Sequence, residues 1–500
     1  MLQFIPGVKC LLYWVLGSIM SLKFEQYLEQ EYTLGPDARF LLEVIVAESE
    51  CAGRQPLRVK ELAKTLCLDE RVVSAGLNEL VAAGVLERLI APRGGRVGRG
   101  KVTYMLCPAN GNRSANRVYL WHAELLQALF SGADMAFPVL GAELIRKGRL
   151  GEPAESGDDD NAAKLKRGRH RLSGGQGRLS VRNRLLFAVL LSRSDRFGEV
   201  QIGVPRLAQL TGMKAEQVKT RLNRLMLLGL IRRHMPGLSS KVFALGRVES
   251  TYFLNIDALE PQETIVIHIA HDTEDKKFTH ADQLRGDCLK GTSRNRTSPD
   301  CLVRLFSGQP MSVFLHFQYR LYSYASHLLS HHWQKLQLGE PIEDDELAAR
   351  IERDFVRTPT PAMTSEIARE LEARVDGEAA ASLRDGAGGE AGQTCACIYE
   401  WAIQIAVAYR ERFGQLSKVD FEKGEIRILP GMSDIGYKAI TVLSQPRHWR
   451  LGRFSVFAEG VRGALERWPA RNESELHLQN RMDFGLASLP VKERRALGLK

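Results

Sequence analysis

Apolar residues recur at helical spacing in two separate stretches of the N-terminal half. The first stretch, residues 37–107, contains three such runs, at 40–45, 59–63 and 72–81. Runs of this spacing are typical of helices that bury one face. Gly84 follows the third run, where a glycine commonly ends a helix. Residues 85–90 and 102–106 have the pattern of two strands. The stretch therefore predicts three helices followed by a β-hairpin.

Residues 178–255 repeat this plan. Their three helical runs lie at 185–191, 204–210 and 218–226. In the third run, Val218, Leu222 and Leu225 fall on one face, as a helix packed on a core requires. Residues 230–234 and 250–254 indicate the strands of a second hairpin. The chain is thus expected to carry two copies of one small helix-and-hairpin unit.

Elsewhere the patterns predict a helical connector, two linkers, two further domains and a polar tail. The connector covers residues 115–147, the linkers 151–177 and 376–393, the domains 256–375 and 395–470, and the tail 471–500. The first linker begins acidic, becomes strongly basic and holds almost no large apolar residue, so it cannot bury enough surface to fold alone. The first of the two domains is expected to be mainly helical and the second mixed. The predicted fold class is mainly α with small β-hairpins.

The composition of the chain indicates which class of partner it binds and in which compartment it resides. The formal net charge is +10, and the basic excess is concentrated before residue 250, which favours a polyanionic partner. The eight cysteines stand mostly as single residues in apolar runs, unlike the dense framework of a secreted disulfide-rich domain. A reducing compartment, the cytoplasm, is therefore expected.

The N-terminal segment, residues 1–22, is unusually apolar and leaves three interpretations open. Met20 is the true start of translation, or the segment is a membrane anchor, or it is a signal peptide. With Met20 as the start, no stable association with a membrane is expected. An exported product would contradict the cytoplasmic assignment.

A motif in the second unit carries a family resemblance. A Leu207–Ala208 pair is followed by Gly212, then by the Val/Leu-spaced run and by Leu225-Met-Leu-Leu-Gly229-Leu-Ile. This string resembles the helix-turn-helix of bacterial winged-helix regulators such as the MarR and GntR families. Gly212 suits the positive backbone angle of a tight turn between helices. Gly229 would end the third helix so that the chain can turn back into the hairpin, or wing.

The resemblance implies that the third helix enters the major groove of double-stranded DNA with its exposed face. That face is expected to hold five donors: Lys214, Gln217, Thr220, Arg221 and Arg224. Arg232, Arg233 and Lys241 add charge around the wing. Donors of these types reach base edges and phosphates. Winged helices also serve as protein-interaction modules, and a solvated basic face is the alternative interpretation.

The first unit matches the family pattern at its core positions. It does not match at the exposed positions of its third helix, the reading face that would contact DNA. The positions that match Lys214, Thr220 and Arg221 are Asp69, Ala75 and Gly76, and acidic residues there repel phosphates. Its hairpin tip is entirely cationic, with Arg93, Arg96, Arg99 and Lys101. This unit is expected either to dock weakly on DNA through that tip or to pair with another subunit, which would give a homodimer.

Two further basic strings resemble known binding motifs. Gly95 to Lys101 has the spacing of a phosphate-binding P-loop, but Val102 stands where Ser or Thr would hold magnesium and a strand follows. The string is therefore interpreted as a basic wing. In the first linker, Arg167 and Arg169 resemble the Arg-Gly-Arg core of minor-groove hooks without the usual proline, which favours non-specific phosphate contact.

The C-terminal half offers little chemistry. His327, His331 and His332 have a spacing that would let two imidazoles share a metal, yet their aromatic-rich helix explains them as packing. Cys395-Ala-Cys397 lacks the spacer of a redox motif. The sequence predicts no enzyme, no cofactor and no metal site.

The function expected from these features is sequence-dependent binding of double-stranded DNA, as a cytoplasmic, nucleoid-associated transcriptional regulator. The first alternative is a replication initiation or maintenance protein of a plasmid or integrative mobile element, because tandem winged helices are also the architecture of plasmid initiators. The second alternative is a winged-helix scaffold that does not bind DNA. Residues 256–500 are expected to form oligomers or to bind a protein partner.

Overall fold

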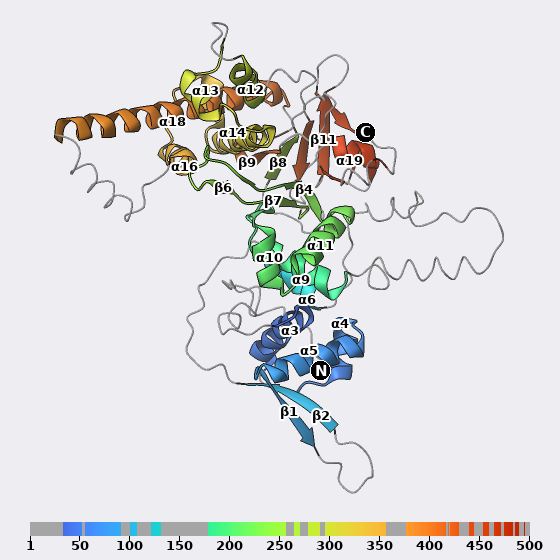
Figure 1. The fold of residues 1–500 in the computed structure, drawn as a ribbon. Helices are drawn as coiled ribbons and strands as arrows, with labels where there is room; N and C mark the ends of the chain where they lie inside the picture. The colour runs from blue at the N-terminus through green and yellow to red at the C-terminus, as the bar shows by residue number, and fades with distance from the viewer. Residues whose placement is uncertain are drawn as a thin grey trace. The chain divides into compact units, whose positions relative to one another are not determined.

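The computed structural model describes a chain that is mainly helical with small β-sheets, as the sequence predicts (Figure 1). The described residues are 34–52, 56–91, 101–107, 122–131, 179–256, 265–270, 279–290, 296–356, 377–416, 419, 421–429, 440–444, 454–459, 465–471, 475–483, 486–489 and 495. They fall into two compact units. Unit 1 comprises Met1–Met235, Ser250–Glu260 and Ala487–Lys500, and unit 2 comprises Pro236–Glu249 and Pro261–Leu486. Within the described parts of the chain, no helix combines the length and apolarity needed to cross a membrane.

The described part of unit 1 begins with three helices and a two-stranded hairpin, referred to below as the first module. Its elements are α3 (Pro36–Ala52), α4 (Val59–Leu66), α5 (Glu70–Ala82), β1 (Leu86–Ala91) and β2 (Lys101–Leu106). The strands are antiparallel, and Leu57 adds an isolated bridge to Tyr104 of β2. α4 ends at Cys67, which has the left-handed φ of 53°. Asp69 then caps α5 by accepting a hydrogen bond from the N–H of Arg71 at 2.7 Å.

The second module has the same plan with a complete third strand. Its elements are α9 (Val181–Leu191), β3 (Glu199–Gln201), α10 (Val204–Thr211), α11 (Ala215–Leu227), β4 (Ile231–Met235) and β7 (Thr251–Leu254). The strands form an antiparallel sheet in the order β3-β7-β4. Gly212 ends α10 with φ 69°, and Gly229 follows α11 with φ 72°. Both glycines thus adopt the left-handed conformation that the sequence predicts for tight turns.

The two modules share one hydrophobic core. Helix α6 (Ala123–Ser131), the described part of the predicted connector, packs against both α3 and α9. The core runs without a break through Phe40, Leu129, Leu185 and Leu225. Side chains along α9 are buried all round, so this helix is covered on every side rather than along one stripe. Its sequence therefore reflects a position between the modules.

Unit 2 surrounds the long helix α14 (Met311–His331), which packs against α18 (Gly377–Phe413) and β9 (Gly424–Leu429). Its other described helices are α12 (His280–Leu289), α13 (Asp300–Phe306), α15 (Trp333–Leu338), α16 (Asp345–Phe355), the short 3₁₀ helix η1 (Phe421–Lys423) and α19 (Leu478–Asp483). Residues 377–393, expected to be a linker, form the first part of α18.

A five-stranded sheet completes unit 2, in the order β12-β11-β10-β8-β9. Its remaining strands are β8 (Ile265–Ala270), β10 (Ile440–Ser444), β11 (Phe454–Glu459) and β12 (Leu465–Trp468). β8 and β9 are parallel and the other pairs antiparallel. The sheet joins regions that the sequence analysis assigned to separate domains, because strands far apart in the chain pair with each other.

The tip of the second module's hairpin belongs to unit 2. Between β4 and β7 the chain forms the short strands β5 (Leu238–Ser239) and β6 (Arg247–Val248). The Phe243 ring lies 5.8 Å from that of Phe355, and the N–H of Ala244 donates to the carbonyl of Asp354 at 2.9 Å. This tip is therefore packed into the helical unit instead of standing out as a wing.

Candidate nucleic-acid interface

Helix α11 of the second module presents a polar face opposite a buried apolar one. Val218 and Leu225 are 0% exposed and Leu222 is 5% exposed, so the predicted inward face is confirmed. Lys214, at the amino-terminal cap, and Gln217 are exposed. The N–H of Lys214 donates to Oε1 of Gln217 at 3.3 Å. This bond uses the amide oxygen and leaves the amide N–H groups of Gln217 on the exposed face.

The next turn of α11 continues this face. Thr220 is exposed and its hydroxyl donates to the carbonyl of Glu216 at 2.9 Å. Lys219, which the sequence analysis did not select, is exposed and pairs with Glu216 at 2.9 Å. The ion pair is open to solvent on both sides, so it contributes little to stability and leaves Lys219 accessible to an anion.

Arg221 does not lie on this open face. It is half-buried, and its guanidinium donates to Oδ1 of Asn183 at 2.9 Å and to the hydroxyl of Ser180 at 3.3 Å, both at the start of α9. Burial, together with the nearby charge of Arg182, lowers the pKa of Arg221. The expectation that Arg221 stands free is wrong, because the first helix of its own module holds it.

Arg224 is also partly covered. It is half-buried, and burial lowers its pKa. The accessible part of the expected reading face is therefore its amino-terminal half, Lys214, Gln217 and Thr220.

The arginines expected around the wing are in the interior of the second module. Arg232 and Arg233 on β4 are 4% and 5% exposed. Nε of Arg232 donates to Oδ1 of Asn255 at 3.0 Å. The expectation that both arginines add charge at the surface is wrong, because the strand is covered on its two faces. Lys241 is exposed, but it lies on the tip that belongs to unit 2.

The first module lacks a comparable face on α5. Asp69 and Ala75 are exposed, whereas Gly76 is buried. A Cβ added at Gly76 would lie 2.6 Å from Cδ1 of Leu41, so this glycine allows α5 to approach α3 closely. The positions that match Arg221 and Lys214 thus have structural roles in the first module. Gly76 allows close packing of α5 on α3, and Asp69 caps α5.

Several expected contacts lie outside the described residues. These are Arg93, Arg96 and Arg99 of the first hairpin tip, Arg167 and Arg169 of the first linker, and the segment 1–22. Lys101 begins β2, and its side chain is not described.

The sequence analysis missed a set of arginines that join the two modules. Arg39 of α3 is buried and donates to the carbonyl oxygens of Gln209 and, at 2.7 Å, of Leu210 in α10. Burial lowers the pKa of Arg39 to about 10, so it stays protonated at neutral pH. A Cβ added at Gly212 would overlap the carbonyl oxygen of Leu34 and lie 2.9 Å from Nε of Arg39. An arginine inside an otherwise apolar helix was the signal that could have revealed this contact.

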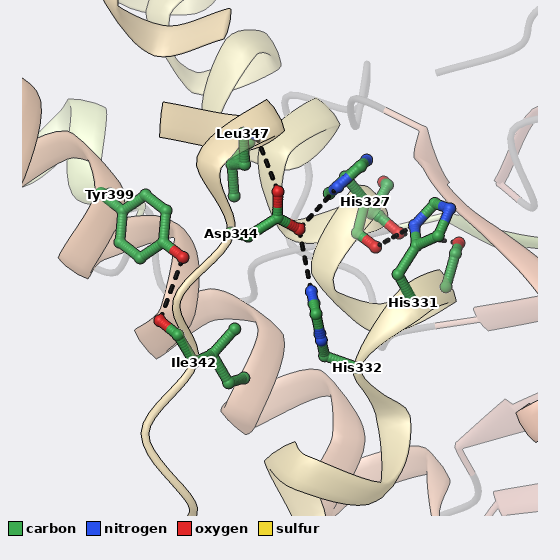
Figure 2. Close-up of polar contacts among 9 residues, drawn as sticks. His327, His331, His332, Ile342, Asp344, Leu347 and Tyr399 are labelled. Carbon is green, nitrogen blue, oxygen red and sulfur yellow. Dashed lines mark hydrogen bonds and ion pairs between the residues drawn. The ribbon is translucent and has the colours of Figure 1, made fainter. Parts of the chain in front are cut away.

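The histidines of α14 form a hydrogen-bonded cluster around one carboxylate (Figure 2). Oδ2 of Asp344 accepts from Nε2 of His327 at 2.9 Å and from Nε2 of His332 at 2.8 Å, while Oδ1 accepts from the N–H of Leu347 at 2.8 Å. Burial alone would raise the pKa of Asp344, but these hydrogen bonds lower it to about 2. The cluster ties the end of α14 to the start of α16. Among the described residues, no three His, Cys, Asp or Glu side chains are placed to hold a metal ion.

The cysteines of unit 2 are reduced. The Sγ atoms of Cys301 and Cys397 lie 3.9 Å apart. Burial and the neighbouring thiol raise the pKa of Cys397 to about 11, which keeps it protonated and unreactive.

A comparison with protein-family models found no match, and neither curated proteins nor solved structures yielded a significant one. The assignment of a function therefore depends on the geometry of this chain alone.

Proposed function

We propose that this chain binds double-stranded DNA in a sequence-dependent manner, with α11 of the second module in the major groove. The observation that carries the proposal is the accessible amino-terminal half of α11, where Lys214, Gln217 and Thr220 stand opposite a fully buried apolar face. The element order α9-β3-α10-α11-β4-β7 supports a winged-helix module. In such modules the first residues of the third helix contact base edges.

Each of these side chains suits a different contact. The free amide N–H groups of Gln217 can donate to an acceptor on a base edge, such as N7 of a purine, and a threonine hydroxyl or methyl contacts several bases. Lys214 is a flexible cation at the helix terminus, suited to a phosphate or to guanine. Each neutralised phosphate should add about 0.9 to the slope of log affinity against log salt concentration.

The test removes two exposed donors in the full-length chain. Lys214→Ala combined with Gln217→Ala should weaken binding to a selected duplex at least about tenfold, given roughly 1–3 kcal/mol for a good base contact. The matched control is Lys335→Ala with Gln337→Ala, which removes the same residue types from the exposed surface of α15 in unit 2. Fluorescence anisotropy at several salt concentrations gives the affinity, and circular dichroism checks the fold. Equal affinities for wild type and the α11 variant would show that α11 is not the reading helix.

The biological process that we propose is transcriptional regulation, and replication or maintenance of a mobile element is the alternative. The observation behind the alternative is the presence of tandem modules in one core together with a large second unit. Genome-wide recovery of bound DNA distinguishes them. Scattered promoters support regulation, one origin-like region supports replication, and no enrichment supports a scaffold that does not bind DNA.

A further inference from the structure

The two modules of unit 1 correspond residue by residue at a constant spacing. Asp37 and Arg182, which are 145 residues apart, are the second residues of α3 and α9. The same spacing separates the starts of α4 and α10, of α5 and α11, and of β1 and β4. Identical residues occupy many of the matched positions, among them Arg39 and Arg184, Leu62 and Leu207, Val73 and Val218, Leu77 and Leu222, and Gly84 and Gly229. The modules therefore form an internal repeat.

The contacts between the modules are reciprocal. Arg39 of α3 reaches the last carbonyls of α10, those of Gln209 and Leu210. Its counterpart Arg184 of α9 reaches the carbonyl of Leu66 at the end of α4, at 3.4 Å. Each arginine thus places its charge at the carboxyl end of the second helix of the other module, where the helix dipole favours a cation.

One contact joins two matched positions to each other. Nη2 of Arg182 lies 2.9 Å from Oδ2 of Asp37, and its Nε donates to Oδ1 at 3.2 Å. Equivalent residues of two copies meet in this way only near a two-fold axis, where the interface is isologous. A half-turn about such an axis would exchange α4 with α10, as the reciprocal contacts of Arg39 and Arg184 require. Unit 1 therefore has the symmetry of a dimer within one chain.

The symmetry stops at the surface of the third helices. The amino end of α11 carries Lys214 and Gln217, whereas the matched positions of α5 are Asp69 and Val72. Glu70 adds a second carboxylate to the exposed amino end of α5. Two carboxylates at this end repel phosphates, so α5 is unsuited to the groove.

We infer that unit 1 is an internal pseudo-dimer and that a single chain binds an asymmetric site on duplex DNA. The protein recognises the base sequence of only one half of that site. This inference rests on the proposed function. The first module occupies the surface of α9 and α10 on which a second copy would otherwise dock. A two-fold pair addresses two half-sites about one helical turn apart. Here α11 reads one half-site, and the first module contacts only the phosphates of the other half-site, through exposed cations of α4 such as Lys60 and Lys64.

The first experiment maps the site in the full-length chain. Hydroxyl-radical footprinting should show backbone protection on both halves, while base substitutions should matter in one half only. Removing about ten base pairs on the unread side should weaken binding roughly tenfold and lower the salt slope, because phosphate contacts are lost. Sedimentation should give one chain per duplex. Two chains on one duplex, base preferences in both halves, or no effect of the shortened flank would each overturn the inference but leave the proposed function intact. No sequence-dependent binding at all would instead overturn the proposed function.

The second experiment tests the two-fold pair by exchanging its charges. Asp37→Arg and Arg182→Asp each place like charges together and should lower both the melting temperature and the affinity for DNA. The double variant, with the charges exchanged, should recover most of both, because the pair is self-complementary. A double variant that is no better than the worse single variant would overturn the pseudo-dimer interface.

Discussion

The first and second modules of unit 1 have one internal framework and two different surfaces. At matched core positions the residues are identical or similar, as at Leu77 and Leu222. At matched surface positions they differ in charge, as at Asp69 and Lys214. The comparison shows that the repeated pattern specifies the fold, whereas the few exposed positions at the start of the third helix decide which module is suited to DNA.

The third helices also meet the first helices by different means. In the first module Gly76 lets α5 approach α3, and a side chain there would collide with Leu41. In the second module Arg221 spans the matching gap and donates hydrogen bonds to Asn183 of α9 and to Ser180, which precedes that helix. The same framework thus accepts either a close contact between the two helices or a bridging cation. In the second module the bridging Arg221 is therefore not available on the exposed face of α11.

The largest expected difference in stability concerns Gly212, in the turn before the third helix of the second module. Gly212→Ala should cost about 3 kcal/mol of unfolding free energy, because a left-handed backbone angle and overlap with the carbonyl of Leu34 act together. Gly84→Ala is the control at another left-handed glycine: its φ is 71°, yet an added Cβ would meet no described atom within 4 Å. It should cost only about 1 kcal/mol. Chemical denaturation of the full chain measures both, and equal losses would contradict the close approach of the modules at Gly212.

Reciprocity of the two buried arginines can be tested next. Arg39→Met removes the donor to the carbonyls at the end of α10 and should cost about 2 kcal/mol, the penalty for leaving buried acceptors unsatisfied. Arg184→Met should cost a similar amount, because it is the matched residue and donates to the carbonyls of Leu129 and Leu66. Unfolding free energies give the values. A loss confined to one variant would mean that the two contacts are not equivalent.

Sensitivity to pH should separate the modules. His234 stacks on Tyr252 with 4.6 Å between ring centroids, and burial lowers the pKa of His234 below 6.5. The unfolded chain therefore binds the proton more readily, so this contribution to stability is present above pH 6.5 and is lost as pH falls through the folded pKa. The matched residue of the first module is Leu89. His234→Leu should reduce the dependence of the melting temperature on pH between 7 and 5. An unchanged pH profile would show that His234 is not its source.

The smallest effect concerns the turn of the first module. Cys67 is the non-glycine residue with a positive φ among the described residues, at 53°. Cys67→Gly should stabilise the chain by up to about 1 kcal/mol, because relief of the left-handed backbone exceeds the added freedom of the unfolded state. Cys67→Ala is the control and should give no gain, since it keeps the strained angle. A thermal melt compares the three proteins, and a gain from alanine as well would attribute the effect to loss of the thiol.

The helices of both modules, their order and the turns between them could be predicted from the pattern of residues alone. Spacing of apolar residues placed α4, α5, α10 and α11 to within a few residues, and Gly212 and Gly229 marked turns that the structure has. These features depend on neighbours a few residues away, so a local pattern is enough to specify them.

Which polar residues remain exposed to solvent could not be predicted in this way, because it depends on how the elements pack. Arg221, Arg232 and Arg233 look like surface cations in the sequence, yet they are covered by α9 and by neighbouring strands. The tip of the second hairpin joins unit 2, and the strands of the five-stranded sheet come from distant parts of the chain. Burial depends on partners brought together from far along the chain, and no local periodicity records which partners those will be.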